Sequence, residues 1–334
     1  MRRLLVLLIL AAALWSGYWF VGSTALRDGA EQWFADQTAR GITAEKTNLT
    51  VAGFPNRFDM TVEGIRFADP QTGIGWDAPF AQIFAMTWKP WHIIAALPPT
   101  QTIRLPDQDI GLAADNLRAS VRARPETSVP LAMAIVESGA WQATSSQGWV
   151  LGAATLVASA AADPDVPAAY DISLDVADLA PDPVLLARLP DAATLPPLVQ
   201  MIRARINARL TAPLDRNAAD TRPRLVGLDV SDVLIGWGDL SVTAKGLIEP
   251  DDAGFASGRI GIEIANWQHL IPLLVASGAV KPEVAPTVRN MLQAMAEDGG
   301  DPSILKLPLT LASGRMSLGP LPLGPAPLLV APTN

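Results

Sequence analysis

The stretch RLVGLDVSDVLIGWGDLSVTAKGLIEPDDAGFASGRIGIEIA, residues 224–265, decides the fold class. Short apolar runs in it are separated by two breaks rich in Gly, Pro and Asp, residues 236–238 and 249–254. Breaks this short join neighbouring strands that run antiparallel. The strands predicted here are residues 224–229, 233–235, 239–248 and 258–265.

The chain on both sides of this stretch has a similar pattern. From Ile42 onward the sequence alternates apolar and polar residues, as half-buried strands do. Gly and Pro interrupt the alternation at short intervals, which is typical of antiparallel strands joined by turns. The further predicted strands are residues 47–51, 58–67, 80–88, 102–105, 111–121, 129–143, 148–158, 170–176, 305–311 and 315–318. The predicted fold class is α+β, mainly antiparallel β, with flanking helices.

Helical spacing of apolar residues interrupts these strands. The predicted helices are residues 26–40, 181–189, 195–210, 267–276 and 282–296. In the third of them, Val199, Ile202 and Ile206 recur at intervals of three and four residues. Its arginines, on or beside the other face, indicate either a solvated face or a basic strip toward acidic lipid headgroups. They are Arg203, Arg205 and Arg209.

The N-terminus has the composition of a membrane span. Arg2 and Arg3 precede an uncharged run, residues 4–21, that is about 27 Å long as a helix. The hydrocarbon core of a bilayer is about 30 Å thick, so this run and its flanks reach across it. The two arginines favour a cytoplasmic N-terminus and export of the rest of the chain. Aromatic residues that suit the outer interface close the run: Trp15, Tyr18, Trp19 and Phe20.

A cleaved signal peptide is the alternative interpretation of this segment. Residues 11–13 and 23–25 are small and suit a cleavage site, although the apolar run continues past the first of them. With a retained anchor, the chain divides into a transmembrane segment (1–25), a β-rich periplasmic domain (26–318) and a Pro-rich tail (319–334). The order of strands and helices suggests two similar halves within the domain, residues 42–180 and 207–318.

Composition excludes several classes of function. The chain has 334 residues, 49% of them hydrophobic, with no Cys and 2 His, which argues against thiolate chemistry, disulfide scaffolds and zinc fingers. The net charge of −8 argues against a nucleic-acid partner. His92 and His269 lie far apart in the sequence, and no metal or cofactor motif surrounds either. We therefore expect no metal and no cofactor.

One short motif has the form of a catalytic signature. Ser303 and Lys306 match the Ser-x-x-Lys pattern of serine β-lactamases, in which the serine lies at the start of a helix. Here Pro302 precedes the serine and an alternating run follows it, which predicts a loop entering a strand. We therefore expect no catalytic residue and no enzymatic activity.

Three segments resemble a bacterial family of unknown function, domain of unknown function number 2125. They are residues 53–59 (GFPNRFD), 236–240 (GWGDL) and 314–324 (GRMSLGPLPLG). The resemblance implies a membrane-anchored chain of about this length. It does not imply a reaction.

Residues 228–278 also resemble, more distantly, the C-terminal part of AsmA-like envelope proteins. The shared features are a Trp-Gly turn, the strand containing Ala244-Lys245-Gly246-Leu247, a second strand at Gly258 and a Leu-rich helix ending at Gly278. This resemblance implies an elongated, curled, groove-like β-sheet linked to lipid transport or outer-membrane upkeep.

The sequence thus predicts a single-pass protein of the bacterial inner membrane that holds lipid or another envelope amphiphile in an apolar β groove. The alternative is a non-enzymatic scaffold of the cell envelope, with unknown protein partners. A hydrolase acting through scattered carboxylates or the Ser-x-x-Lys motif is the third hypothesis. The family-motif and candidate groove residues are Gly53, Phe54, Pro55, Arg57, Phe58, Trp88, Trp91, Trp237 and Gly238.

Overall fold

The structure, a computed structural model, describes residues 1–190 and 195–329. Among these residues 50% lie in strands and 23% in helices, and the sheet is not closed. The strand pairings given below are all antiparallel, so the predicted mainly antiparallel β class is confirmed. The chain divides into two compact units: unit 1 comprises residues 1–125 and 136–149, and unit 2 comprises residues 126–135 and those from 150 on.

Unit 1 is built around a long β-hairpin of two strands, β3 (Arg57–Asp69) and β4 (Ile74–Met86), paired along their whole length. β1 and β2 pair with β3, while β5 and β6 pair with opposite ends of β4. β8 continues the sheet from β5, and β7 with β10 continues it from β6. The bounds of these strands are β1 Thr43–Glu45, β2 Asn48–Ala52, β5 Lys89–Ala96, β6 Thr100–Leu105, β7 Gln108–Ala114, β8 Arg118–Ala123 and β10 Trp141–Ser145.

The alternation in β3 changes phase at a glycine. Met60 and Val62 are buried at even positions, whereas Ile65 is buried at an odd one. Gly64 lies between them with φ of 61°, in the left-handed region, and a Cβ there would lie 2.6 Å from the side chain of Thr47. This glycine therefore lets both halves of the strand bury their apolar side chains on one face.

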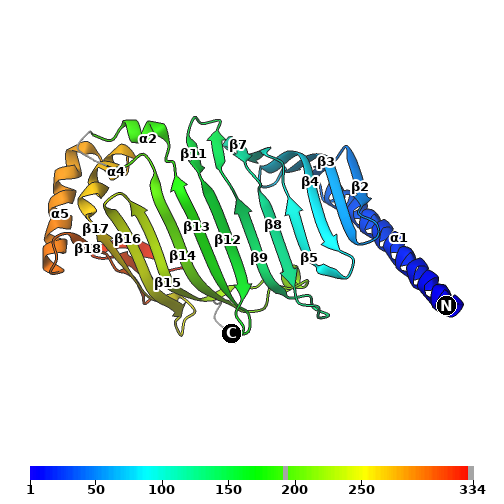
Figure 1. Ribbon diagram of the computed structural model, residues 1–334. Helices are drawn as coiled ribbons and strands as arrows, with labels where there is room; N and C mark the ends of the chain where they lie inside the picture. Colours follow the sequence, from blue (N-terminus) through cyan, green and yellow to red (C-terminus); the bar gives the residue numbers. More distant parts are fainter. Residues whose placement is uncertain (191–194, 330–334) are drawn as a thin grey trace. The chain divides into compact units, whose positions relative to one another are not determined.

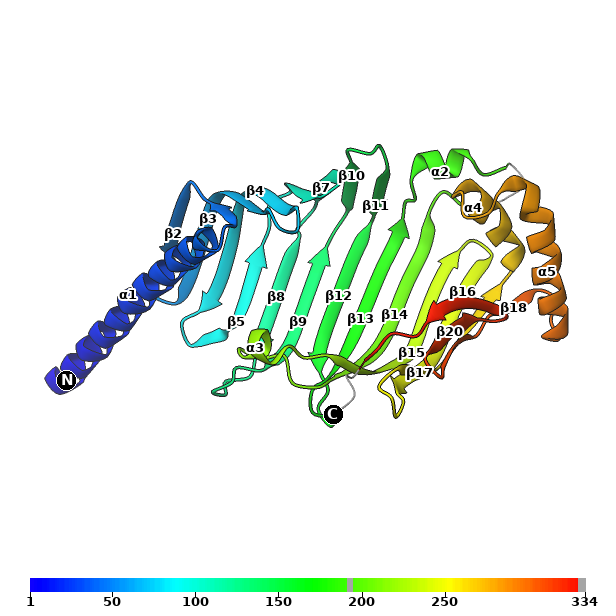
Figure 2. The ribbon, with the colours of Figure 1, turned by 180° about the vertical axis from the view of Figure 1, so that it is seen from behind.

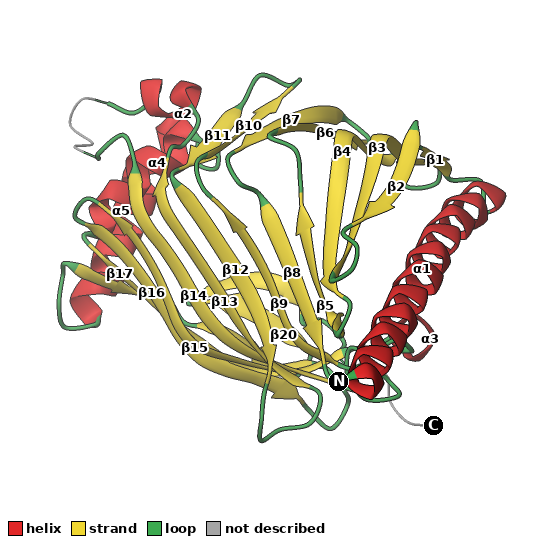
Figure 3. Ribbon diagram, turned by 45° about the vertical axis from the view of Figure 1, so that its right-hand side comes forward, coloured by secondary structure: helices red, strands yellow, loops and turns green. Residues whose placement is uncertain are grey.

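A continuous helix, α1 (Arg2–Ala39), joins the predicted membrane span to the predicted helix after it. It ends at Ala39, one residue before the predicted end at residue 40, and Gly41 follows with a φ of 83°. Within the described part of the chain, it is the one helix long and apolar enough to cross a membrane, and a signal sequence would have the same properties. Its N-terminal half projects beyond the sheet (Figure 1), and its C-terminal end lies beside β1 and β2 (Figure 3).

Unit 2 is a meander followed by short strands. Strands β12 to β17 pair in sequence order, β17 then pairs with β18 and β19, and β20 and β21 follow (Figure 2). The strand bounds are β11 Val150–Ala153, β12 Thr155–Ala162, β13 Ala169–Leu179, β14 Val199–Leu210, β15 Leu225–Trp237, β16 Leu240–Pro250, β17 Ala256–Ala265, β18 Ile304–Lys306, β19 Leu309–Ala312, β20 Arg315–Leu318 and β21 Leu321–Pro325. The division between the units falls within β9 (Leu131–Ser138).

The helix predicted over residues 195–210 is wrong, because β14 occupies most of this segment. Its three arginines are two and four residues apart, and a spacing by even numbers places side chains on one face of a strand. Each arginine pairs with a carboxylate on another strand of the same sheet, β15, β13 or β16, and such opposite charges across a sheet stabilise the strand. The pairs are Arg203 with Asp232, Arg205 with Asp175, and Arg209 with Glu249.

Helices cover part of unit 2 and complete its core. The predicted helices at residues 267–276 and 282–296 are present as α4 (Leu270–Ala276) and α5 (Ala285–Asp298), each preceded by a short 3-10 turn, Trp267–His269 or Pro282–Val284. The largest core cluster of this unit surrounds Trp267, which is fully buried. Two short helices, α2 (Pro183–Ala187) and α3 (Ala218–Thr221), lie elsewhere in unit 2.

The predicted extended tail begins as the edge strand β21, which pairs with β20. Ala326 after it is buried, so this part of the tail belongs to unit 2. Residues 330–334 of the predicted tail lie outside the described residues.

Candidate functional site

Aromatic side chains fix α1 to the start of the β3–β4 hairpin. The indole Nε1 of Trp19 donates to the carbonyl oxygen of Arg57 at 2.7 Å, and the Trp19 side chain is 7% exposed. Its ring packs edge-on against Phe54 and stacks on Phe58, with ring centroids 5.4 and 6.2 Å away. Gly22 lies one turn further along α1, where a Cβ would come within 2.7 Å of the Phe58 ring. The helix and the sheet are therefore in close contact at this point.

Two further aromatic residues of α1 bind the same region. Trp15 donates from Nε1 to the carbonyl oxygen of Pro55 at 3.0 Å, and the Tyr18 hydroxyl donates to that of Thr87 at 2.8 Å. We call Trp15, Tyr18 and Trp19 the docking residues. They belong to the aromatic group that the sequence assigns to the outer interface, and the structure shows that their polar atoms bind the protein.

A second set of contacts holds the C-terminal half of α1. Lys46 lies 2.7 Å from the carboxylate of Glu31 and 5.5 Å from the centre of the Phe34 ring. The ring of Trp33 stacks on Phe67 of β3, with centroids 6.2 Å apart. These contacts lie more than two helical turns from the docking residues, so α1 is fixed to the sheet at two separate points.

Between these two points, an apolar cavity of about 640 Å³ separates α1 from the sheet. Three of the helix residues here, Ala25, Gly29 and Ala30, are small, and a Cβ added at Gly29 would meet no atom within 4 Å. The helix therefore cannot fill the space over the sheet. The lining residues are Ala25, Leu26, Gly29, Ala30, Trp33 and Phe34 of α1 and Met60, Val62, Ile65, Phe67, Trp76, Ala81 and Ile83 of the sheet.

The chemistry of this cavity suits a hydrocarbon chain. None of the lining residues is charged, and the indole N–H of Trp76 already donates to Gln101 at 2.6 Å. A volume of this size lies in the range of about 300–1,000 Å³ that is usual for small-molecule sites. The cavity offers dispersion contacts and exclusion of water, with no acid, base or nucleophile among the residues that line it.

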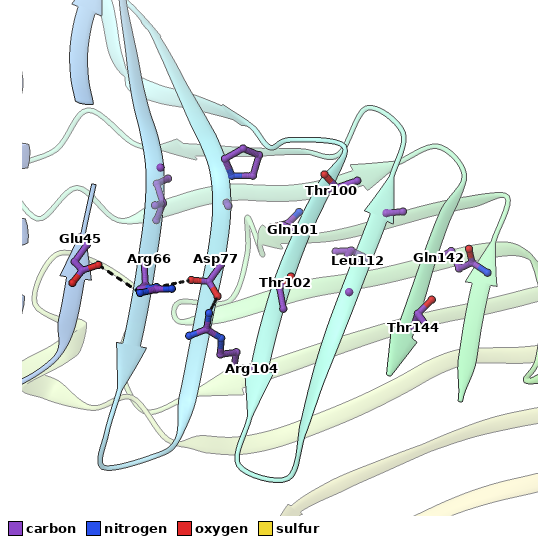
Figure 4. A pocket seen from close by; sticks show the side chains of 16 residues that line it. Glu45, Arg66, Asp77, Thr100, Gln101, Thr102, Arg104, Leu112, Gln142 and Thr144 are labelled. Carbon is purple, nitrogen blue, oxygen red and sulfur yellow. Dashed lines mark ion pairs between the residues drawn. The ribbon is translucent and has the colours of Figure 1, made fainter. Parts of the chain in front are cut away.

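A polar depression of about 850 Å³ also lies in unit 1 (Figure 4). Arg66 pairs with Asp77 at 3.4 Å and approaches Glu45 at 4.0 Å, and Asp77 also pairs with Arg104. The two positive and two negative charges balance, and threonine and glutamine side chains make up most of the other polar lining. Because these charged groups already pair with one another, the depression offers no uncompensated charge to a substrate.

The Ser-x-x-Lys motif does not have the geometry of a serine β-lactamase. The hydroxyl of Ser303 donates to Asp301 at 2.6 Å, and the backbone amide of Ser303 donates to the same carboxylate. These hydrogen bonds hold the pKa of Asp301 below its usual value. Ser303 precedes the strand that contains Lys306, whereas the β-lactamase serine begins a helix, so the predicted loop entering a strand is present.

The two histidines lie in different units. The ring of His92 in β5 lies 3.0 Å from the hydroxyl of Ser120, and His269 ends a 3-10 turn in unit 2. Among residues 1–190 and 195–329, no group of three or more His, Cys, Asp or Glu side chains is placed to hold a metal ion.

The structure brings together six of the nine candidate residues from the sequence. Phe54, Pro55, Arg57 and Phe58 contact the docking residues of α1, and Gly53 and Trp88 lie next in sequence to residues that do. Trp91 lies half-buried on β5. Trp237 and Gly238 belong to unit 2, where the buried Trp237 donates to Pro196 at 2.7 Å and the amide of Gly238 donates to Gln200 at 2.8 Å.

The residues that line the cavity are absent from the set of candidates chosen from the sequence. The alternation of Met60 and Val62 was sufficient to predict a buried face of a strand. Ala25 and Gly29 lie four positions apart on one face of the helix. Because both are small, they could have indicated that the helix leaves open space on that face.

Comparison with known proteins places the chain in a family. The sequence model of the family described as "Uncharacterized protein conserved in bacteria (DUF2125)" matches residues 19–327. The chain belongs to this family. The resemblance seen in residues 53–59, 236–240 and 314–324 is therefore confirmed, and the match to DUF2125 begins at the docking residue Trp19. No curated protein and no solved structure matches this DUF2125 chain, and its likeness to AsmA-like proteins stays a prediction.

Proposed function

We propose that this DUF2125 protein is anchored in the bacterial inner membrane by α1 and binds an acyl chain of an envelope lipid in the cavity between α1 and the sheet. The observation that supports this most strongly is that the membrane helix itself forms one wall of an apolar cavity. An acyl chain leaving the outer leaflet would move along the anchor into that space. Each buried methylene contributes about 0.8 kcal/mol, so a chain needs no polar partner in the cavity to bind.

Retention of the anchor follows from the same contacts. Cleavage after residue 25 would remove all three docking residues and Ala25, the first residue of the helix wall of the cavity. We therefore propose that the segment is an anchor and that its cleavage as a signal peptide does not occur. Arg2 and Arg3 favour a cytoplasmic N-terminus, which assigns both units to the periplasm. The proposed activity is binding and involves no bond chemistry.

The test of this function compares two helix glycines. Gly29→Leu places a side chain in the cavity, whereas Gly17→Leu places the same side chain at an open position of α1 outside it. We expect the wild type and Gly17→Leu to retain a lipid through purification in a mild detergent. We expect Gly29→Leu to retain at least tenfold less, because leucine occupies the volume of the chain. Native mass spectrometry measures the bound fraction.

Two results would contradict the proposed function. Equal lipid occupancy in Gly29→Leu and Gly17→Leu would show that the bound lipid lies outside the cavity. Wild-type protein that carries no lipid would also contradict the proposal. Thermal unfolding of both variants checks that neither substitution has disrupted the fold.

A scaffold function is the second candidate, and it rests on β21. Leu321 and Leu323 are 45% and 50% exposed on this edge strand. Pro322 and Pro325 lack an N–H, which disfavours pairing with a further strand and leaves side-chain contact as the mode of binding. Crosslinking in cells distinguishes the functions, since a scaffold yields protein adducts at this strand.

A further inference from the structure

The length of α1 that is free of protein contact is too short to cross a bilayer. The first docking residue is Trp15, so only residues 4–14 of the apolar run precede all contact with the sheet. As a helix this stretch is about 16 Å long, whereas the hydrocarbon core is about 30 Å thick. The missing length must come from the part of α1 that is already bound to unit 1.

The part of unit 1 at this level consists of two loops. One joins β2 to β3 (residues 53–56), and the other joins β4 to β5 (residues 87–88). Both contact α1 at the docking residues, through Pro55 and Thr87. If α1 spans the bilayer, these two loops are carried to its outer interface.

Four large exposed side chains at this level are apolar. Phe54 is 52% exposed and Trp88 is 55% exposed, one on each loop. Phe20 of α1 is 59% exposed and stacks on Phe54, with ring centroids 5.7 Å apart. Met86, at the end of β4, is 42% exposed. Aromatic residues of this kind are enriched at the boundary between headgroups and acyl chains.

The loop backbone is also suited to an environment with little water. Within a bilayer each unpaired carbonyl costs several kcal/mol, so loops there need internal partners. The docking residues of α1 donate to the carbonyls of Pro55, Arg57 and Thr87. Asn56 O accepts from the amide and hydroxyl of Thr87, and Gly53 O accepts from the amides of residues 56 and 57.

Cationic residues flank the apolar side chains. Arg57 begins β3 with its side chain 52% exposed, and Lys89 begins β5 directly after Trp88. Arg57 pairs with Asp59 on the same strand. Basic groups next to interfacial aromatic residues suit the phosphates of lipid headgroups.

We infer that the loops at residues 53–56 and 87–88 form a membrane-contact surface that inserts Phe54 and Trp88 into the outer headgroup layer of the bilayer that α1 crosses. This inference rests on the proposed membrane anchor but does not depend on the cavity holding a lipid. The surface fixes unit 1 directly on the membrane, with the apolar cavity opening next to the outer leaflet.

Single-cysteine labelling tests this surface, because the chain has no cysteine of its own. Phe54→Cys and Trp88→Cys are each labelled with the fluorophore NBD in vesicles of phosphatidylethanolamine and phosphatidylglycerol. Ile74→Cys is the matched control, since Ile74 is 49% exposed at the opposite end of β4, about 40 Å along the strand. Leu8→Cys reports on the anchor itself.

For NBD at positions 54 and 88, we expect blue-shifted emission and at least threefold quenching by lipids that carry a spin label on the headgroup. For NBD at position 74, we expect neither effect. Label at position 8 should be quenched by lipids that carry the spin label deep in the acyl chain. Labels at 54 and 88 that behave like the one at 74, while position 8 is quenched, would overturn the membrane-contact surface and leave the anchor standing. An unquenched label at position 8 would overturn the anchor. The two loops are labelled separately, and circular dichroism confirms the fold of each variant.

Discussion

Replacing Trp19 by alanine is expected to release the N-terminal half of α1 from the sheet of unit 1, at a cost of about 3–5 kcal/mol in the free energy of docking. The indole is 7% exposed, packs on two phenylalanine rings and donates to the carbonyl of Arg57. Its removal leaves a void and an unpaired carbonyl together. Release of this half of the helix loosens the cavity wall that begins at Ala25, so bound lipid should also fall in the same variant.

Trypsin cleavage measures this release. Arg27 is exposed on α1 but lies in a helix held at both ends, so wild-type protein should resist cleavage there. Trp19→Ala should be cut many times faster, whereas Trp19→Phe keeps most of the ring contact and should lose about 1 kcal/mol. Val21→Ala is the control, since Val21 is 72% exposed on the same helix. Cleavage of Trp19→Ala at the wild-type rate would contradict the docking described above.

The second large effect is expected in unit 2. Trp267→Ala should destabilise this unit by about 3–5 kcal/mol, because Trp267 is 0% exposed in the largest core cluster. Its indole also donates to the carbonyl of Pro302 at 3.0 Å, which joins the α4 region to the loop before β18. Thermal unfolding of the purified protein measures the loss.

A control within the same unit separates this effect from that of removing any large apolar side chain. Met291→Ala removes a side chain that is 36% exposed on α5, and we expect a change below about 1 kcal/mol. Similar losses in Met291→Ala and Trp267→Ala would contradict a core centred on Trp267.

Much of the fold could be predicted from the sequence because its strands alternate with period two. β16 and β17 follow the predicted boundaries within two residues. β14 was predicted as a helix because Ile202, Ile206 and Leu210 are four residues apart. This spacing places side chains on one face of a helix and also on one face of a strand. The polar positions decide between them, since arginine at 203, 205 and 209 fits only the strand.

The candidate site was predicted only in part. Residues 53–58 and Trp88 lie beside α1 at the start of the β3–β4 hairpin, yet no local sequence pattern predicts that the helix folds back along β3. That placement depends on contacts between residues far apart in the chain, such as Trp19 with Arg57 and Glu31 with Lys46. The cavity exists only because of this placement, so local sequence patterns could not reveal it.

Photo-crosslinking from a lipid tests the central claim most directly. The wild-type protein is placed in nanodiscs with phosphatidylethanolamine that has a diazirine on its acyl chain, and the adducts are mapped by mass spectrometry. Lipid around the anchor will label residues 4–14 in any case, so the decisive adducts are those on the sheet wall. The account predicts adducts on Met60, Val62 and Ile83. Adducts confined to the exposed part of α1, with none on β3 or β4, would contradict it.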